Sequence, residues 1–178
     1  MPLPRIIEIC GSEMNKCLRC GNCCTRFGVC ITPFDIRRIV KTTGLKPSEF
    51  ADYISEPKER ERKEPAILID GKPSLLVLRR NQNNVCFFYS PSGCKAYSFR
   101  PMLCRTYPFK LEEGKLRDMR SRACIECWHP DEKSECEYEY VHDIKKYEKE
   151  IEEYKKIAEK WNAKGGGSFR KFLDSISR

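Results

Sequence analysis

The feature that most constrains this chain is a group of four cysteines within eight consecutive residues, Cys17-Leu18-Arg19-Cys20-Gly21-Asn22-Cys23-Cys24. Two cysteines separated by two residues, such as Cys17 and Cys20, form a turn whose sulfur atoms lie close enough to bind one metal ion. Gly21 supplies the permissive backbone that this turn requires. Three of the four thiols can converge on one point, whereas the adjacent fourth must point elsewhere. We therefore interpret this stretch as a metal-binding loop.

Twelve cysteines in 178 residues indicate either a disulfide framework or metal ligation, and the redox state of the compartment decides between them. The N-terminal stretch has a charge inside its short apolar run and no small-residue cleavage site, so we do not interpret it as a signal peptide. No run of about 18 apolar residues is present, so we expect no membrane span. These features predict a cytoplasmic protein with reduced thiols. A mainly disulfide-bonded chain is the alternative, because the many Lys and Glu with Gln82 as the single glutamine resemble hyperthermophile composition.

The formal net charge of +8 would be compatible with a nucleic-acid partner, but this value counts every cysteine as neutral. Two zinc ions on eight thiolates would remove about four of these charges, and one cubane iron–sulfur cluster on four thiolates about two. The remaining charge is mildly basic and gives little support for nucleic-acid binding. With 34% charged residues and a mean hydropathy of -0.63, the chain has few apolar residues with which to build a hydrophobic core. We therefore expect the cysteines to help stabilise the fold.

The first half of the chain predicts two helices that provide a hydrophobic wall for the metal region. Thr32 is a suitable N-cap, Pro33 fits the first helical position, and Asp35 lies where a carboxylate accepts from the unpaired amides. Gly44 ends this helix. A second helix is expected from Ser48, and its buried stripe would consist of Phe50, Tyr53 and Ile54.

Two hairpins are predicted further along the chain. The first joins two apolar runs, at 66–69 and 75–78, around a turn with Gly71. The second joins 109–111 and 115–117 around Glu113-Gly114. Between the hairpins, short turns separate the single cysteines Cys86, Cys94 and Cys104, with spacings of eight and ten residues. Such spacings are typical of ligands carried on successive loops.

From Glu137 onward the chain predicts a long amphipathic helix. Its apolar residues recur at alternating steps of four and three, at Tyr140, Ile144, Tyr147, Ile151, Tyr154, Ala158 and Trp161. This seam packs either against its own domain or, through the helix 140–161, against a partner protein or a second copy. Three glycines at 165–167 end the helix, and a short helix follows Ser168. We therefore divide the chain into a cysteine-cluster domain, 1–136, and a helical C-terminal extension, 137–178.

The cysteine spacing leaves the identity of the metal open. The Cys-x2-Cys-x2-Cys core is similar to the loop around one side of a cubane iron–sulfur cluster, although no Cys-Pro follows it here. Cys17 with Cys20 and Cys124 with Cys127 could instead close one four-thiolate zinc site.

Together these features resemble the CxxCxxCC cysteine-cluster family, described as a "putative zinc- or iron-chelating domain". The resemblance covers residues 14 to 127 and is carried by the first cysteine group, the Thr-Pro-x-Asp-Ile helix start, the Cys86 and Cys94 loops, and Arg100-Pro101-x-x-Cys104-Arg105-x-Tyr107-Pro108-Phe109. It implies zinc or an iron–sulfur cluster as cofactor and eight metal ligands: Cys17, Cys20, Cys23, Cys24, Cys86, Cys94, Cys104 and Cys124. Four cysteines lie outside this set: Cys10, Cys30, Cys127 and Cys136.

One branch of that family is similar to flagellin lysine N-methylases. The chain has no glycine-rich strand-to-helix turn of the kind expected at a methyl-donor site, so we do not expect this activity. No serine or cysteine is visibly placed with a histidine base, which argues against a hydrolase. His129 is a possible substitute metal donor, and His142 is expected to be solvated.

The surroundings of Cys104 carry two further expectations. Arg100 and Arg105 flank it, and they either donate to its sulfur and offset the negative charge of the site or pair with surface carboxylates. The segment Tyr107-Pro108-Phe109 is expected to pack as a lid over the metal.

The sequence therefore predicts a small α+β metal-binding protein, with its core nucleated by cysteine-bound zinc or an iron–sulfur cluster and with an unknown biochemical role. Two other functions stay open. One is an iron–sulfur enzyme or electron-transfer protein. The other is a protein or RNA interaction module with structural zinc, in which the long helix is the contact surface.

Overall fold

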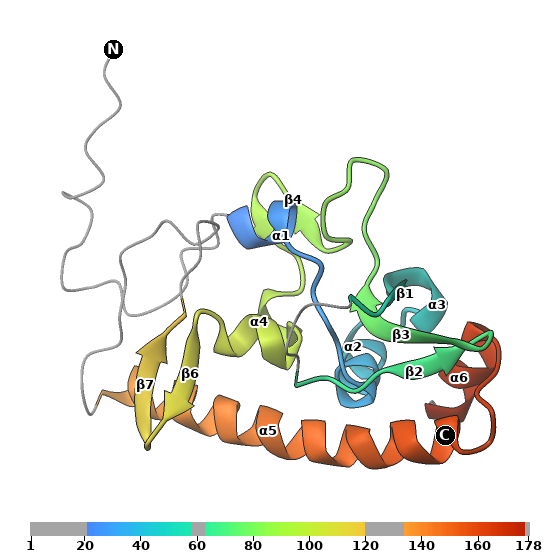
Figure 1. The fold of residues 1–178 in the computed structure, drawn as a ribbon. Coiled ribbons are helices and arrows are strands. Elements are labelled where there is room, and N and C mark those ends of the chain that lie inside the picture. Colours follow the sequence, from blue (N-terminus) through green and yellow to red (C-terminus); the bar gives the residue numbers. More distant parts are fainter. Residues whose placement is uncertain (1–20, 58–62, 120–133, 177–178) are drawn as a thin grey trace.

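The computed structural model describes residues 21–57, 63–119 and 134–176, and over these ranges the chain has the α+β fold that the sequence predicts. In Figure 1 the long helix α5 (Glu135–Asn162) runs along one side of the molecule. A hairpin lies beside its N-terminal end, a short helix beside its middle, and a three-stranded sheet toward its C-terminal end. Helix α5 thus contacts the hairpin, the short helix and the sheet.

The remaining elements are short. The helices are α1 (Asn22–Arg26), α2 (Pro33–Thr43), α3 (Pro47–Phe50), α4 (Met102–Thr106) and α6 (Phe169–Ile176), with a 3-10 helix at Tyr97–Phe99. The strands are β1 (Ala51–Ser55), β2 (Ile67–Ile69), β3 (Lys72–Leu78), β4 (Tyr89–Ser90), β5 (Gly93–Cys94), β6 (Phe109–Glu112) and β7 (Lys115–Asp118). They form antiparallel sheets in the orders β1-β3-β2, β4-β5 and β6-β7.

Helix α2 begins and ends where the sequence predicts. The Thr32 hydroxyl accepts from the Asp35 amide at 3.1 Å, and the Asp35 carboxylate accepts from the Thr32 amide at 2.8 Å. This reciprocal capping box satisfies two amides at the start of the helix. Gly44 ends the helix in the left-handed region with a φ of 71°.

The predicted helix from Ser48 through Ile54 is wrong. Helix α3 stops after one turn at Phe50, and Ala51–Ser55 forms strand β1, which pairs with β3. The side chains of Tyr53 and Ile54 are 39% and 41% exposed instead of buried. The central strand β3 needs a hydrogen-bonding partner along this edge, and this pairing overrides the helical periodicity of a short segment.

Both predicted hairpins are confirmed. Strands β2 and β3 join through Asp70 and Gly71, whose φ angles are 49° and 77°. Strands β6 and β7 join through Glu113 and Gly114, with φ angles of 50° and 76°. Two consecutive residues at positive φ are what a tight two-residue hairpin turn requires, and glycine adopts this conformation at low cost.

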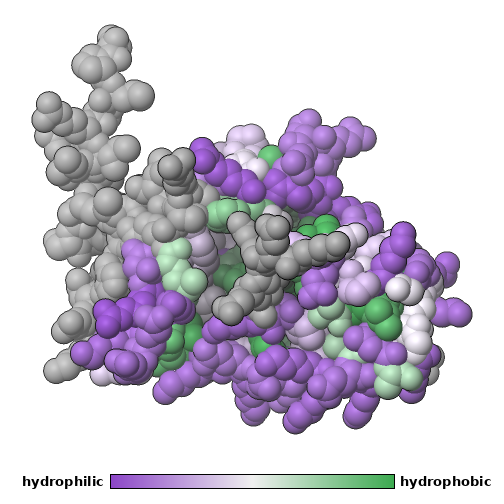
Figure 2. Space-filling model, viewed as in Figure 1, coloured by the Kyte–Doolittle hydropathy of each residue, from purple (hydrophilic) through white to green (hydrophobic). Residues whose placement is uncertain are grey.

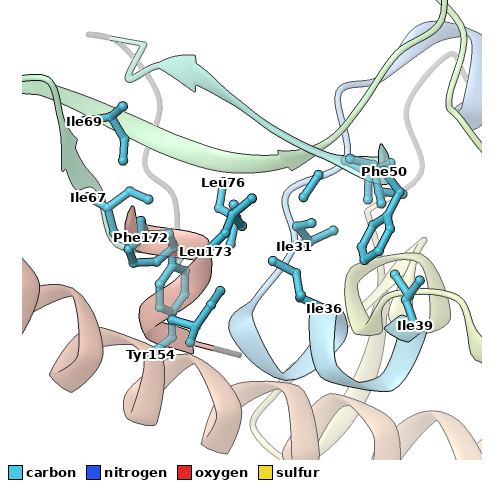
Figure 3. Close-up of a cluster of buried hydrophobic side chains, with 14 of the residues drawn as sticks. Ile31, Ile36, Ile39, Phe50, Ile67, Ile69, Leu76, Tyr154, Phe172 and Leu173 are labelled. Carbon is cyan, nitrogen blue, oxygen red and sulfur yellow. The ribbon is translucent and has the colours of Figure 1, made fainter. Parts of the chain in front are cut away.

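The main hydrophobic core lies between the three-stranded sheet and helices α2, α3, α5 and α6, as Figure 3 shows. Its labelled members come from all of these elements: Ile31, Ile36, Ile39, Phe50, Ile67, Ile69, Leu76, Tyr154, Phe172 and Leu173. The C-terminal helices therefore contribute directly to the core that α2 and the sheet build. The domain boundary at 136/137 stays a prediction.

The apolar seam of α5 is buried within the chain. Tyr140, Ile144, Tyr147, Ile151, Tyr154 and Ala158 are each no more than 6% exposed. Figure 2 shows hydrophilic side chains along the outer side of this helix. Binding of a partner or of a second copy through helix 140–161 stays a prediction.

An ionic network around the buried Asp35 fixes α4 to α2 and α5. The Arg38 guanidinium donates to the carboxylate of Asp35 on its own helix and to Glu150 on α5, the latter at 2.8 Å. The amide of Met102, the first residue of α4, also donates to Asp35, at 2.9 Å. One carboxylate thus caps two helices. None of the helices in the described ranges combines the length and the hydropathy of a membrane span.

Candidate metal centre

Five of the eight predicted ligands lie in the described ranges, on four segments. Cys23 and Cys24 are in α1, Cys86 precedes β4, Cys94 is the last residue of β5, and Cys104 is in α4. All five carry free thiols. The other three, Cys17, Cys20 and Cys124, lie outside the described residues, as do Cys10, Cys127 and His129.

The start of α1 depends on Gly21, which has the permissive backbone that the sequence predicts for it, here at the start of a helix. Gly21 has a φ of 78°, in the left-handed region that a residue with a side chain rarely adopts. A Cβ at this position would collide with the ring of Tyr89 in β4. The tight approach brings the beginning of α1 against the strand pair in which Tyr89 lies opposite Cys94.

A backbone hydrogen bond joins the first cysteine group to the Cys86 segment. The Cys86 amide donates to the Cys24 carbonyl at 2.9 Å. The sulfur atoms of the vicinal residues Cys23 and Cys24 are 3.9 Å apart. The Cys24 thiol also interacts with the Cys86 thiol, so Cys24 lies between two other sulfur atoms.

Cys94 and Cys104 complete the group that the structure describes. Cys24, Cys94 and Cys104 are half-buried and pack against the main core, of which Cys86 is a buried member. Ionisation of Cys23, Cys86 or Cys94 would raise the pKa of Cys104, which burial already raises. Thiols from α1, the Cys86 segment, β5 and α4 are therefore electrostatic neighbours beside the main core.

Hydrogen bonding divides these thiols into two kinds. The hydrogen bond between Cys23 and Cys24 is the main cause that lowers the pKa of Cys23 to about 7, and the interaction of Cys86 with Cys24 is the main cause that lowers the pKa of Cys86 to about 7. The same two interactions are the main causes that raise the pKa of Cys24. Burial raises the pKa of Cys94 and, to a larger extent, that of Cys104. Cys23 and Cys86 are therefore the thiols that most readily become thiolates.

Arg100 places positive charge beside the thiols. Its guanidinium lies over the ring of Tyr97, with Cζ 4.0 Å from the centroid, and Nη1 donates to the Tyr97 carbonyl at 2.8 Å. The charge favours the thiolate forms of Cys23 and Cys94. Its Nε is buried and has no acceptor among the described residues. Of the two alternatives that the sequence left open, the position of Arg100 therefore favours compensation of the negative charge of the thiolates.

Arg105 follows the second alternative, in which the arginine pairs with a carboxylate. Its Nε donates to the Asp143 carboxylate on α5 at 2.8 Å. It pairs with a carboxylate and contributes to the packing of α4 on α5. Arg80 also lies close to the thiols, and its charge favours the thiolate of Cys86. The sequence carries no signal for this role, because Arg80 stands in an ordinary polar stretch.

The expected lid divides into two parts. The Tyr107 ring packs edge-on against Phe27, the residue after α1, with centroids 6.0 Å apart. Phe109 instead packs on Tyr140 of α5, at 5.1 Å, in a separate hydrophobic cluster. The prediction that all three residues form a lid over the metal is therefore wrong, because Phe109 packs in a different cluster. His142 on α5 has a side chain that is 74% exposed, as predicted.

The donor chemistry fits a thiolate-bound metal. Within the described ranges, no group of three or more His, Cys, Asp or Glu side chains is arranged to hold a metal ion by itself. The gathered donors are all sulfur, the ligand type of structural zinc and of iron–sulfur clusters. The unpaired buried Nε of Arg100 provides a donor for a negatively charged group at this position.

Comparison with known proteins adds one finding. The model of the CxxCxxCC family, described as "Putative zinc- or iron-chelating domain", matches residues 16–138, more than half of the chain. The matched range includes all eight predicted ligands. No curated protein and no solved structure matches the chain.

Proposed function

Because the chain belongs to the CxxCxxCC family, we propose that it is a metal-binding protein that holds zinc or an iron–sulfur cluster through cysteine thiolates. The proposed ligands are Cys17, Cys20, Cys23, Cys24, Cys86, Cys94, Cys104 and Cys124. The observation that carries this proposal is the gathering of five of these thiols from four segments beside Arg80 and Arg100. Binding of metal would stabilise the charge that several close thiolates create.

The two metals supply different chemistry to the same residues. Zinc has no redox chemistry and ties the segments together, whereas an iron–sulfur cluster also exchanges single electrons. Among the described ligands, the pKa values of Cys23 and Cys86 are lowered to about 7, so these thiols lose their protons most easily, whereas the pKa of Cys24 is raised. We place the protein in a reducing cytoplasm, because thiolate ligands must stay reduced.

Metal binding is expected to contribute to folding. The ligands come from segments that are far apart in the sequence, so they converge only in the folded chain, and binding free energy becomes folding free energy. Apparent binding free energies of structural zinc sites are about 10–16 kcal/mol, which is comparable to the whole stability of a small domain.

The test is anaerobic purification followed by metal analysis and an absorption spectrum. We expect bound zinc, or bound iron with acid-labile sulfide and visible absorption. Removal of the metal by a chelator should abolish or strongly weaken the cooperative thermal unfolding measured by circular dichroism. Unchanged cooperative unfolding after metal removal would contradict the proposal, and so would a purified protein with its cysteines paired in disulfides.

Cysteine variants separate ligands from other thiols. Cys86→Ser and Cys104→Ser should lower the amount of metal per chain in the purified protein. Cys30→Ala is the matched control, because Cys30 is 1% exposed in the core and is not a proposed ligand. Its loss should lower stability without a change in metal content. Equal metal content in all three variants would exclude Cys86 and Cys104 as ligands.

A further inference from the structure

The guanidinium of Arg80 lies between two cysteine-bearing segments that are far apart in the sequence. On one side it donates to the carbonyl of Thr25, at 2.9 Å, and to the carbonyl of Phe27. On the other side its Nε donates to the Asn84 side-chain oxygen at 2.8 Å, and Nη2 also donates to the Asn84 carbonyl. Arg80 thus makes hydrogen bonds to both segments with one rigid group.

The first of these segments directly follows two proposed ligands. Thr25 lies in the last turn of α1 and Phe27 is its C-cap, immediately after Cys23 and Cys24. Carbonyl groups at the end of a helix lack partners within the helix, and a cation there also complements the helix dipole. Arg80 therefore satisfies the end of the helix that carries Cys23 and Cys24.

The second segment directly precedes another proposed ligand. Asn84 belongs to the turn that leads to Cys86, and its φ of 57° lies in the left-handed region. The backbone of Arg80 itself pairs with Cys86 in an antiparallel bridge, next to the hydrogen bond from the Cys86 amide to the Cys24 carbonyl. Loss of the Arg80 side chain would therefore leave the backbone hydrogen bond from Cys86 to Cys24 and the interaction of these two thiols to join the segments.

We propose that Arg80 is a positioning residue of the metal centre, which holds Cys23 and Cys24 in register with Cys86. This inference rests on the proposed function, since the register matters because these thiols bind one metal centre. The side chain is suited to the task because its planar fork presents several donors in fixed directions. Lysine carries the same charge but makes a single point contact, so it does not replace the fork.

The experiment compares the cobalt affinity of four proteins: the wild type, Arg80→Lys, Arg80→Gln and the control Arg105→Gln. Cobalt(II) is the probe, because thiolate ligation gives it intense ultraviolet and visible absorption, and its dissociation constant is measured by competition with a chelator. We expect both Arg80 variants to bind cobalt about 10- to 100-fold more weakly, the usual effect of losing a residue that orients metal ligands. Arg105→Gln should change the affinity by no more than about fivefold, because it removes only a partly exposed ion pair with Asp143.

A second readout is independent of metal affinity. Amide hydrogen exchange at Cys86, measured on the protein as purified, reports the hydrogen bond to Cys24. Exchange at this amide should be faster in both Arg80 variants and unchanged in Arg105→Gln. If the wild type binds neither cobalt nor iron, the proposed function fails, and the exchange rates still decide whether Arg80 holds the two segments together.

The proposal is overturned if Arg80→Lys binds cobalt like the wild type, or if the Cys86 amide exchanges at the wild-type rate in both Arg80 variants. Asn84→Gly provides a milder variant in case Arg80→Gln does not fold. Glycine keeps the positive φ of this position and removes one of the acceptors of Arg80. This variant should show a smaller effect in the same direction on both readouts, and wild-type values of both would also overturn the proposal.

Discussion

Among single residues, Gly21 shows how strictly the chain is constrained at the start of α1. Its φ of 78° and the nearby Tyr89 ring both oppose a side chain. We expect Gly21→Ala to lower the free energy of unfolding by about 2–5 kcal/mol, through backbone strain and displacement of the ring, as measured by urea denaturation. Gly44→Ala is the control, because Gly44 has a φ of 71° but nothing within 4 Å of its Cβ position. It should cost about 1–2 kcal/mol. Equal losses would exclude a role for Tyr89.

Among the elements, the placement of α4, and with it Cys104, depends on Asp35 in α2. This buried carboxylate accepts from the amides of Thr32 and Met102 and from Arg38. Asp35→Ala would leave the buried amides of Thr32 and Met102 without their acceptor and remove one of the two carboxylates that pair with Arg38, so we expect a loss of about 3–5 kcal/mol in the free energy of unfolding. Asp143→Ala removes a more exposed pair with Arg105 and should cost about 0–1 kcal/mol. Urea denaturation of the two variants measures the difference. Similar small losses would show that Asp35 is dispensable for docking α4.

At the scale of the whole molecule, the core depends on the last helix. Phe172, Leu173 and Ile176 of α6 are buried in the main core or at its border. Each contributes about 1.5–3 kcal/mol, and the sum is comparable to the total stability of a domain. A chain that ends before Ser168 should therefore lose its cooperative thermal transition, as measured by circular dichroism. Ile54→Ala is the control, because Ile54 is 41% exposed and should change stability by about 0.5 kcal/mol or less. A shortened chain that still unfolds cooperatively would contradict this assignment of the core.

The elements that the sequence predicted correctly depend on local signals. The capping box of α2, the glycine turns of both hairpins and the periodicity of α5 are each visible within a few residues or turns of chain. Strand β1 could not be predicted in this way, because it exists through pairing with β3, about two dozen positions further along the chain. A short segment with apolar residues at mixed spacing is compatible with both a helix and an edge strand.

The residues of the candidate site also differ in whether a local signal in the sequence predicts them. The spacing of Cys17 to Cys24 is a local signal for metal binding, whereas the inclusion of Cys86, Cys94 and Cys104 came from the family resemblance. Arg80 was missed because its partners Thr25 and Phe27 are 55 and 53 positions away, and nothing in its immediate neighbourhood indicates that contact. The full set of eight ligands stays a prediction, since three of them lie outside the described residues.

The separate hydrophobic clusters at the two ends of α5 have a consequence for how this molecule opens. The hairpin β6–β7 is attached to the N-terminal part of α5 through Phe109, Tyr140 and Ile144, with Leu111 and Leu116 at the border, whereas the C-terminal part is anchored in the main core. Fewer buried apolar side chains attach the hairpin end among the described residues, so we expect the hairpin to detach at a lower free energy than the elements of the main core. We therefore expect the mechanical stiffness of the molecule to increase along α5, from the end that carries the hairpin to the end that lies in the main core.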